Sequence, residues 1–163
     1  LYLEHSKITD FETGQILFIA LFSFISALMI GFFEELIFRG GILMGLKSIF
    51  PNHKLAVILS SSVIFGLVHL SNLGAQSFWD TMNQVYMAFA VGVLFSVIFL
   101  VSENLFIPII LHTVVDTTDL FTSFFYKGSE SSGFSWIIFT FSLLYLISAY
   151  YLYKKEFSNN KLI

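Results

Sequence analysis

The chain has 163 residues, of which 56% are hydrophobic and 12% are charged, and its mean hydropathy is +0.83. Because globular domains carry roughly 25% charged residues, this composition indicates an integral membrane protein, with the lipid bilayer as its surroundings. A net charge of −3 with 8 scattered Lys and Arg residues argues against a nucleic-acid partner, and the absence of cysteine excludes disulfides, thiolate metal sites and cysteine nucleophiles.

Apolar stretches predict an all-α fold, a polytopic transmembrane helical bundle with about five spans. A helix needs about 20 apolar residues to cross a bilayer. In chain order, the predicted helices are residues 15–46, 55–71, 84–102, 105–125 and 134–153. The first stretch is too long for one straight span, so we expect it to tilt, bend or protrude. It also has Gly41 and Gly45 at a G-x-x-x-G spacing, which we interpret as a helix-packing feature.

The helices are expected to form one domain over residues 11–153, with flanking tails at 1–10 and 154–163. No internal repeat or second domain is visible. We expect Trp79 to lie in a loop before the third span and Trp136 to begin the last span, where tryptophan anchors helices at the membrane surface.

The lysines predict the orientation in the membrane. Threading the spans through a bilayer places one group of lysines on one side, Lys47, Lys54, Lys154, Lys155 and Lys161, and a smaller group on the other, Lys7 and Lys127. Basic residues favour the cytoplasmic side, so we expect a cytoplasmic C-terminus. The first residue is Leu1 rather than Met, and it lies on the outer side in this topology, so we also expect earlier spans to precede it.

A few ionisable residues lie inside the predicted spans. A charged side chain in the centre of a membrane costs about 2.5 to 3.5 kcal/mol, and such residues normally face the protein interior. They are Glu34, Glu35, Arg39, His69, His112, Asp116 and Asp119. Any one of them alone is explained by helix packing, but the first six together favour a functional site. Asp119 lies near the outer end of its helix and is left out of the predicted site.

The stretch "GFFEELIFRGG" contains three of these residues. Glu35 and Arg39 are four positions apart with the acid first, which favours an ion pair on one helix face. Glu34 lies about 100° round the helix, so it faces another wall of the bundle without that partner. The spacing therefore marks Glu34 as the carboxylate available for acid–base chemistry.

Two further pairs have the same spacing. In "FGLVHL", Phe65 can pack beside His69 and limit its rotamers, and in "HTVVD", Asp116 can hydrogen-bond His112 and fix its tautomer. Measured from the connection between the first two spans, Glu34 lies about 25 Å and His69 about 22 Å along their helices, so the two can meet. His112 joins them only if the connection at 102–104 is sunk below the ends of the other helices.

Three known intramembrane protease signatures are absent: H-E-x-x-H of zinc enzymes, G-x-S-G of rhomboids and G-x-G-D of presenilin-like enzymes. The chain has instead E-E-x-x-x-R, F-x-x-x-H and H-x-x-x-D, in that order and each in a predicted span. This set resembles the CPBP family, which comprises CAAX prenyl proteases and bacteriocin-processing proteins and is also called the abortive-infection family.

The resemblance implies a glutamate-type intramembrane endopeptidase, a hydrolase, and this chain looks like the C-terminal part of its eight-span type of fold. By the resemblance, Glu34 is the general base that acts with His69 on a water molecule, and His112 with Asp116 stabilises the oxyanion. Glu35 and Arg39 hold the geometry of their helix. The Asn of many members is Asp116 here, so the carboxylate either orients His112 or is protonated.

The resemblance also implies a peptide or protein substrate, prenylated, CAAX-like or bacteriocin-type, reaching a bacterial cell membrane protein from the membrane or its cytoplasmic face. No cofactor is expected, although Glu34, His69 and His112 are also a possible ligand set for a catalytic zinc. Two other functions stay open: a non-catalytic bacteriocin-immunity or scaffold protein, and a fragment of a proton-coupled transporter. The lack of an inverted repeat counts against the transporter.

Overall fold

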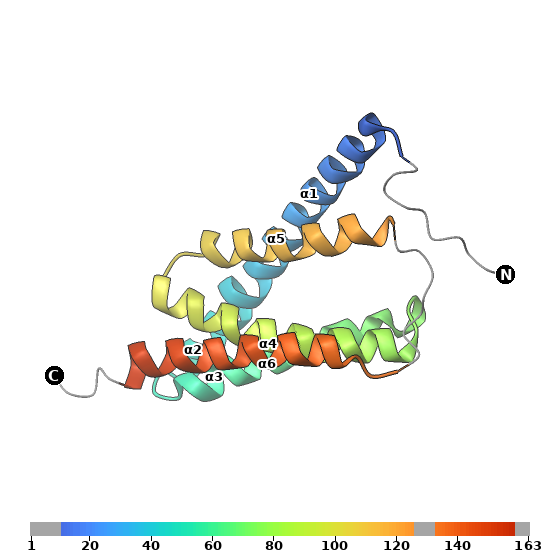
Figure 1. Cartoon of the computed structure of the whole chain (residues 1–163). Coiled ribbons are helices and arrows are strands. Elements are labelled where there is room, and N and C mark those ends of the chain that lie inside the picture. The colour runs from blue at the N-terminus through green and yellow to red at the C-terminus, as the bar shows by residue number, and fades with distance from the viewer. Residues whose placement is uncertain (1–10, 126–132, 159–163) are drawn as a thin grey trace.

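The computed structural model describes residues 11–125 and 133–158. Most of the predicted tails and three of the lysines used for the orientation, Lys7, Lys127 and Lys161, lie outside these residues. In chain order the elements are α1 (Thr13–Glu35), the π-helix η2 (Leu36–Leu43), α2 (Met44–Ile49), α3 (Lys54–Val68), the 3-10 helix η3 (His69–Gly74), α4 (Phe78–Ser102), α5 (Phe106–Ser123), α6 (Trp136–Tyr153) and the π-helix η4 (Lys154–Ser158). The part of the chain described is thus all-α, as predicted (Figure 1).

Among the described residues, four helical segments are long and apolar enough to cross a membrane: Thr13–Ile49, Lys54–Gly74, Phe78–Ser102 and Trp136–Phe157. The helix predicted at 105–125 is present as α5, but it is not one of these four candidate spans. The physical reason is its composition, because His112, Asp116, Asp119 and several threonines lower its hydropathy. The predicted bundle is therefore confirmed, with four candidate spans and one more polar helix.

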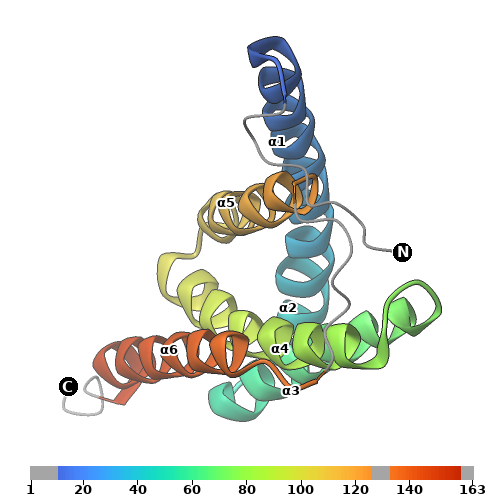
Figure 2. The ribbon, with the colours of Figure 1, turned by 45° about the vertical axis from the view of Figure 1, so that its right-hand side comes forward.

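The helices form two packed groups. α3, α4 and α6 lie side by side, and α5 packs along α1 (Figures 1 and 2). Between α3, α4 and α6 a core is formed by Ile58, Val93, Val97 and Ala149. The η2 segment contacts both α3 and α4 and so joins the two groups. α1 begins beyond the rest of the bundle in both views, as its length predicted.

The first long helix changes its winding where its charges lie. It is an α-helix as far as Glu35 and a π-helix over Leu36–Leu43. Short π-helical segments are rare and are found frequently at functional sites. This widened segment carries Arg39 and starts directly after Glu34 and Glu35.

The start of α4 differs from the prediction. We expected this helix to begin near residue 84, with Trp79 in a loop, but α4 begins at Phe78 and Trp79 lies in its first turn. Ser77 is the N-cap, and its hydroxyl accepts a hydrogen bond from the backbone N–H of Asp80 at 3.2 Å. Because such a cap satisfies an N–H that the helix leaves open, it extends the helix past the apolar stretch.

The close helix contacts are not at the predicted glycines. A Cβ at Gly45 would meet nothing within 4 Å, and one at Gly41 only its own helix. The tight positions are Gly66 and Gly92, where α3 meets α4, and Gly31, where α1 meets α5. The prediction of helix packing at Gly41 and Gly45 was therefore wrong. A glycine spacing alone does not show which face of the helix meets a neighbouring helix.

Candidate active site

The predicted ion pair between Glu35 and Arg39 is present and buried. Arg39 Nη1 donates to Glu35 Oε1 at 2.8 Å. The side chain of Arg39 is 1% exposed and that of Glu35 is 0% exposed. Arg39 Nη2 also donates to the backbone carbonyl of Gly92 at 3.4 Å. The guanidinium lies 4.6 Å from the ring centre of Phe65 and 5.5 Å from that of Phe95. Arg39 is thus fixed by a carboxylate, a carbonyl and two aromatic faces.

The same Glu35 oxygen binds His112. The distance from His112 Nδ1 to Glu35 Oε1 is 2.8 Å, and both side chains are buried. Because an ionised carboxylate only accepts hydrogen bonds, Nδ1 carries a proton. We expected Asp116 to fix this tautomer from within the same helix, but Glu35, on another helix, does so. A carboxylate behind a histidine ring orients the ring and stabilises its protonated form.

The other ring nitrogen of His112 faces two carboxylates. Glu34 Oε2 lies 3.6 Å and Asp116 Oδ2 lies 3.5 Å from His112 Nε2. These contacts are favourable only when a proton lies on Nε2 or on one of the carboxyl groups. Glu34 therefore does not face a separate wall of the bundle, since Glu34 and Glu35 approach opposite nitrogens of one imidazole. A doubly protonated His112 therefore has negative partners on both sides, Glu35 at Nδ1 and Glu34 with Asp116 at Nε2.

His69 is held differently. It is the first residue of η3, directly after α3, and its Nδ1 lies 2.9 Å from the backbone carbonyl of Phe65. A carbonyl only accepts, so Nδ1 carries the proton and the neutral ring keeps a lone pair on Nε2. The predicted aromatic packing is also present, because the ring centres of Phe65 and His69 are 5.2 Å apart. The Phe65 ring is 6.1 Å from His112 as well, so it packs against both imidazoles.

A cavity of about 630 Å³ joins the two histidines. Its lining includes Phe65, His69, His112, Asp116 and Asp119. Asp119 was omitted from the predicted site, yet it lies on this cavity one helical turn beyond Asp116. Glu34 does not line the cavity in this conformation, and no hydrogen bond or ion pair joins it to His69 within the described residues. Glu34 meets the site through the ring of His112.

The alternative metal site gains no support from the geometry. Among residues 11–125 and 133–158, no three His, Asp or Glu side chains are arranged to hold one metal ion. His69 and His112 line one cavity, and Glu34 contacts the ring of His112.

Several residues that shape the site were missed from the sequence. Gly31 allows α5 to bring His112 against α1, Gly92 accepts from Arg39, and Phe95 packs 5.7 Å from the ring of His112. All three are apolar or small residues inside apolar helices, so nothing in the local pattern distinguishes them from packing residues. Only the pairing of helices far apart in the chain reveals them.

Comparison with known proteins gives one family. Residues 16–118, more than half of the chain and including every predicted site residue, match the family described as type II CAAX prenyl endopeptidase, Rce1-like. This agrees with the resemblance to CPBP proteins seen in the three motifs. No curated protein and no solved structure matches the chain.

Proposed function

Because the chain belongs to the type II CAAX prenyl endopeptidase Rce1-like family, we propose that it is a glutamate-type intramembrane endopeptidase. With four candidate spans in its described part, it is an integral membrane protein of a protease family. One observation carries the proposal: the imidazole of His112 is placed between Glu35 and Glu34 at a cavity that His69 also lines. Helix packing alone does not require acidic and basic side chains to be arranged around one cavity.

The first step is the activation of a water molecule. With the Glu34 side chain turned from His112 toward the cavity, a water molecule between Glu34 and His69 would donate one hydrogen bond to the carboxylate and one to the free Nε2 of His69. Its oxygen attacks the carbonyl carbon of the scissile bond while its proton passes to Glu34. Exclusion of bulk water from the membrane interior strengthens these interactions.

The second step is stabilisation of the tetrahedral oxyanion. His112 already donates from Nδ1 to Glu35, so a proton on Nε2 makes it a cationic donor aimed at Glu34, Asp116 and the cavity. Such a donor stabilises the negative charge that develops on the carbonyl oxygen. Asp116 also contacts His112 Nε2 and orients the proton on that nitrogen before the substrate enters. When the intermediate collapses, the C–N bond breaks and the proton taken from water passes to the leaving amine.

The family description suggests the substrate class, a CAAX-type prenylated protein or a peptide of similar chemistry. We propose that this substrate enters from the bilayer or its cytoplasmic face, and that the protein resides in a bacterial cell membrane with a cytoplasmic C-terminus. The lysines at one end of the bundle support this orientation.

The test is a cleavage assay with the purified chain reconstituted in lipid, using prenylated and unprenylated peptides. Glu34→Gln is expected to lower kcat by about 10²- to 10⁴-fold, the usual contribution of a general base. The matched control is Glu12→Gln, an exposed position at the start of α1, which should stay within twofold of wild type. Equal products at equal rates from wild type and Glu34→Gln would contradict the mechanism.

A second arm treats wild type with a chelator. We expect no loss of cleavage, because the proposed steps use protein groups alone. Full loss that zinc restores would support the alternative metal site. If no peptide is cleaved, proton flux that depends on Glu34 would favour a transporter, and bacteriocin protection that survives Glu34→Gln would favour a scaffold.

A further inference from the structure

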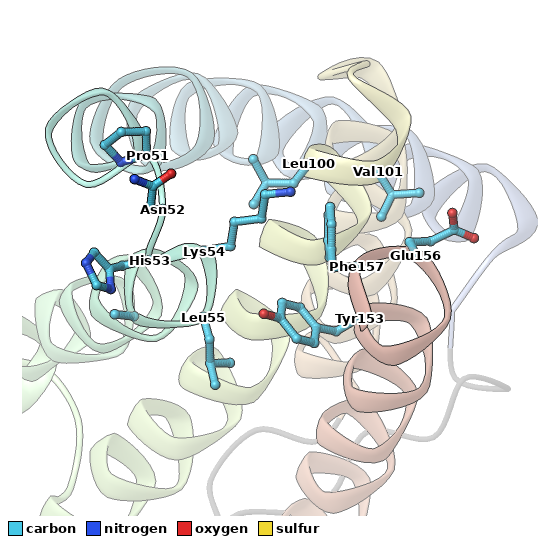
Figure 3. Close-up of a pocket in the computed structure, with 11 residues that line it drawn as sticks. Pro51, Asn52, His53, Lys54, Leu55, Leu100, Val101, Tyr153, Glu156 and Phe157 are labelled. Carbon is cyan, nitrogen blue, oxygen red and sulfur yellow. The ribbon is translucent and has the colours of Figure 1, made fainter. Parts of the chain in front are cut away.

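A second cavity lies at the other end of α3 from His69. It has a volume of about 870 Å³ and shares no lining residue with the cavity of the candidate active site. Its walls come from the connection before α3, the start of α3, the end of α4 and the end of the last helical segment (Figure 3). Among the lining residues are Asn52, Lys54, Leu100, Val101, Tyr153 and Phe157.

The cavity presents a positive charge that has no acidic partner among the described residues. Lys54 Nζ lies 4.6 Å from the ring centre of Phe157, and no carboxylate of the described residues lies within ion-pair distance of it. Glu156 also lines the cavity, but its carboxylate contacts Lys155 at 3.8 Å and points away from Lys54 in Figure 3. A cation stacked on an aromatic ring keeps its charge and is held in place. The cavity is therefore suited to an anion.

Uncharged hydrogen-bond donors lie beside the charge of Lys54. His53 precedes α3 as the N-cap residue and provides no side-chain cap, so no side chain of the described residues accepts a hydrogen bond from the first N–H groups of the helix. These groups and the positive end of the helix dipole favour a negative ligand. Asn52 and Tyr153 supply an amide and a hydroxyl to the lining. Leu100 and Val101 provide an apolar wall beside these polar groups.

The position of the cavity indicates what kind of anion reaches it. All four candidate spans have one end at this face of the bundle, because the first ends at Ile49, the second begins at Lys54, and the others end at Ser102 and Phe157. The face is thus a membrane boundary, where lipid headgroups lie. Basic pockets between helices at such boundaries bind the headgroups of acidic phospholipids.

We propose that this cavity binds the phosphate headgroup of an anionic phospholipid, with Lys54 as the main contact. The phosphate lies between Lys54 and the start of α3, and the acyl chains follow the apolar surface at the ends of α4 and α6. This proposal does not depend on the proteolytic function, since the site lies about 22 Å along α3 from His69.

The experiment measures lipid binding to the purified full chain in detergent by native mass spectrometry, with phosphatidylglycerol, phosphatidylcholine and inorganic phosphate as separate probes. Phosphatidylglycerol is expected to bind more tightly than phosphatidylcholine. Lys54→Gln should weaken its binding about fivefold, the usual effect of one basic residue at an acidic membrane surface. Lys54→Arg should retain binding. Thermal unfolding without added lipid verifies that each variant is folded.

The matched control is Lys47→Gln, which removes the same charge near the same end of the bundle at a residue that does not line the cavity. It should stay within twofold of wild type. Equal losses from Lys47→Gln and Lys54→Gln would overturn the proposal, because attraction would then depend on net charge alone. Displacement of the lipid by an equal concentration of inorganic phosphate would also overturn it, in favour of a site for free phosphate.

Discussion

At the scale of single residues, Glu35 connects the charge and the chemistry of the site. Its Oε1 accepts hydrogen bonds from both Arg39 and His112 at 2.8 Å. Its Oε2 is buried without a hydrogen-bond partner in the described part of the chain, as is Arg39 Nε. The carboxylate therefore has two separate tasks, to neutralise a buried guanidinium and to orient an imidazole. Variants can separate these tasks.

We predict that Glu35→Leu destabilises the protein by about 3 to 5 kcal/mol, because it leaves Arg39 buried and unpaired. The double variant Glu35→Leu with Arg39→Met removes both charges and should recover most of that free energy of unfolding. Cleavage should stay low in both, since His112 Nδ1 has lost its acceptor. Unfolding in mixed detergent micelles and the cleavage assay measure the two effects. Wild-type cleavage by the double variant would show that Glu35 serves only to neutralise Arg39.

Side-chain contacts were predictable from the sequence only between residues of the same helix. The ion pair of Glu35 with Arg39 and the packing of Phe65 on His69 follow from a spacing of four, and both are present. The hydrogen bond between Glu35 and His112 joins residues 77 positions apart, and no helical spacing encodes it. For that reason Asp116, the nearest acid in sequence, was assigned the role that Glu35 has.

At the scale of helices, the contact of α1 with α5 determines where His112 lies. A Cβ built at Gly31 would come within 3.3 Å of His112 Cβ and of the backbone nitrogen of Thr113. Backbone atoms cannot move aside as a flexible side chain does, so α5 must give by a few tenths of an ångström to accept an added Cβ. The hydrogen bond from His112 to Glu35 depends on the distance between α1 and α5.

We predict that Gly31→Ala destabilises the protein by about 1 to 3 kcal/mol through overpacking and lowers cleavage, because α5 carries His112 away from Glu35. Gly45→Ala is the control, in the same continuous helix but with nothing within 4 Å of the added Cβ. It should be neutral or stabilising by up to about 1 kcal/mol, since alanine favours helix over glycine. Equal stability and activity of the two variants would show that the contact at Gly31 does not position the site.

The helices themselves were largely readable from apolar length, and their irregular parts were not. The helix ending at Ser102 was predicted to its last residue, where Glu103 adopts a left-handed φ of 52°. The π-helical segment after Glu35 was not predicted, because widened turns depend on contacts with α3 and α4 rather than on hydropathy. The sequence required only that a stretch of this length bend or protrude.

At the scale of the whole molecule, the two cavities lie at opposite ends of one span. The candidate active site adjoins His69 at the end of α3, and the proposed lipid site adjoins Lys54 at its start. The described bundle thus separates a cavity lined by acids and histidines from a cavity lined by a lysine. This arrangement makes the direction in which Lys54–Gly74 crosses the membrane testable by labelling.

The absence of cysteine allows each position to be labelled without background. Asn52 and Gln76 are exposed and flank the candidate span Lys54–Gly74, whose length of about 30 Å matches the bilayer core. We predict that an impermeant maleimide labels Gln76→Cys on intact cells, and labels Asn52→Cys only after permeabilisation, because basic residues favour the cytoplasmic side. Ser48→Cys, exposed at the end of α2, should behave as Asn52→Cys does. Labelling of both loops from one side would show that the segment does not cross, and the reverse pattern would show that the orientation inferred from the lysines is wrong.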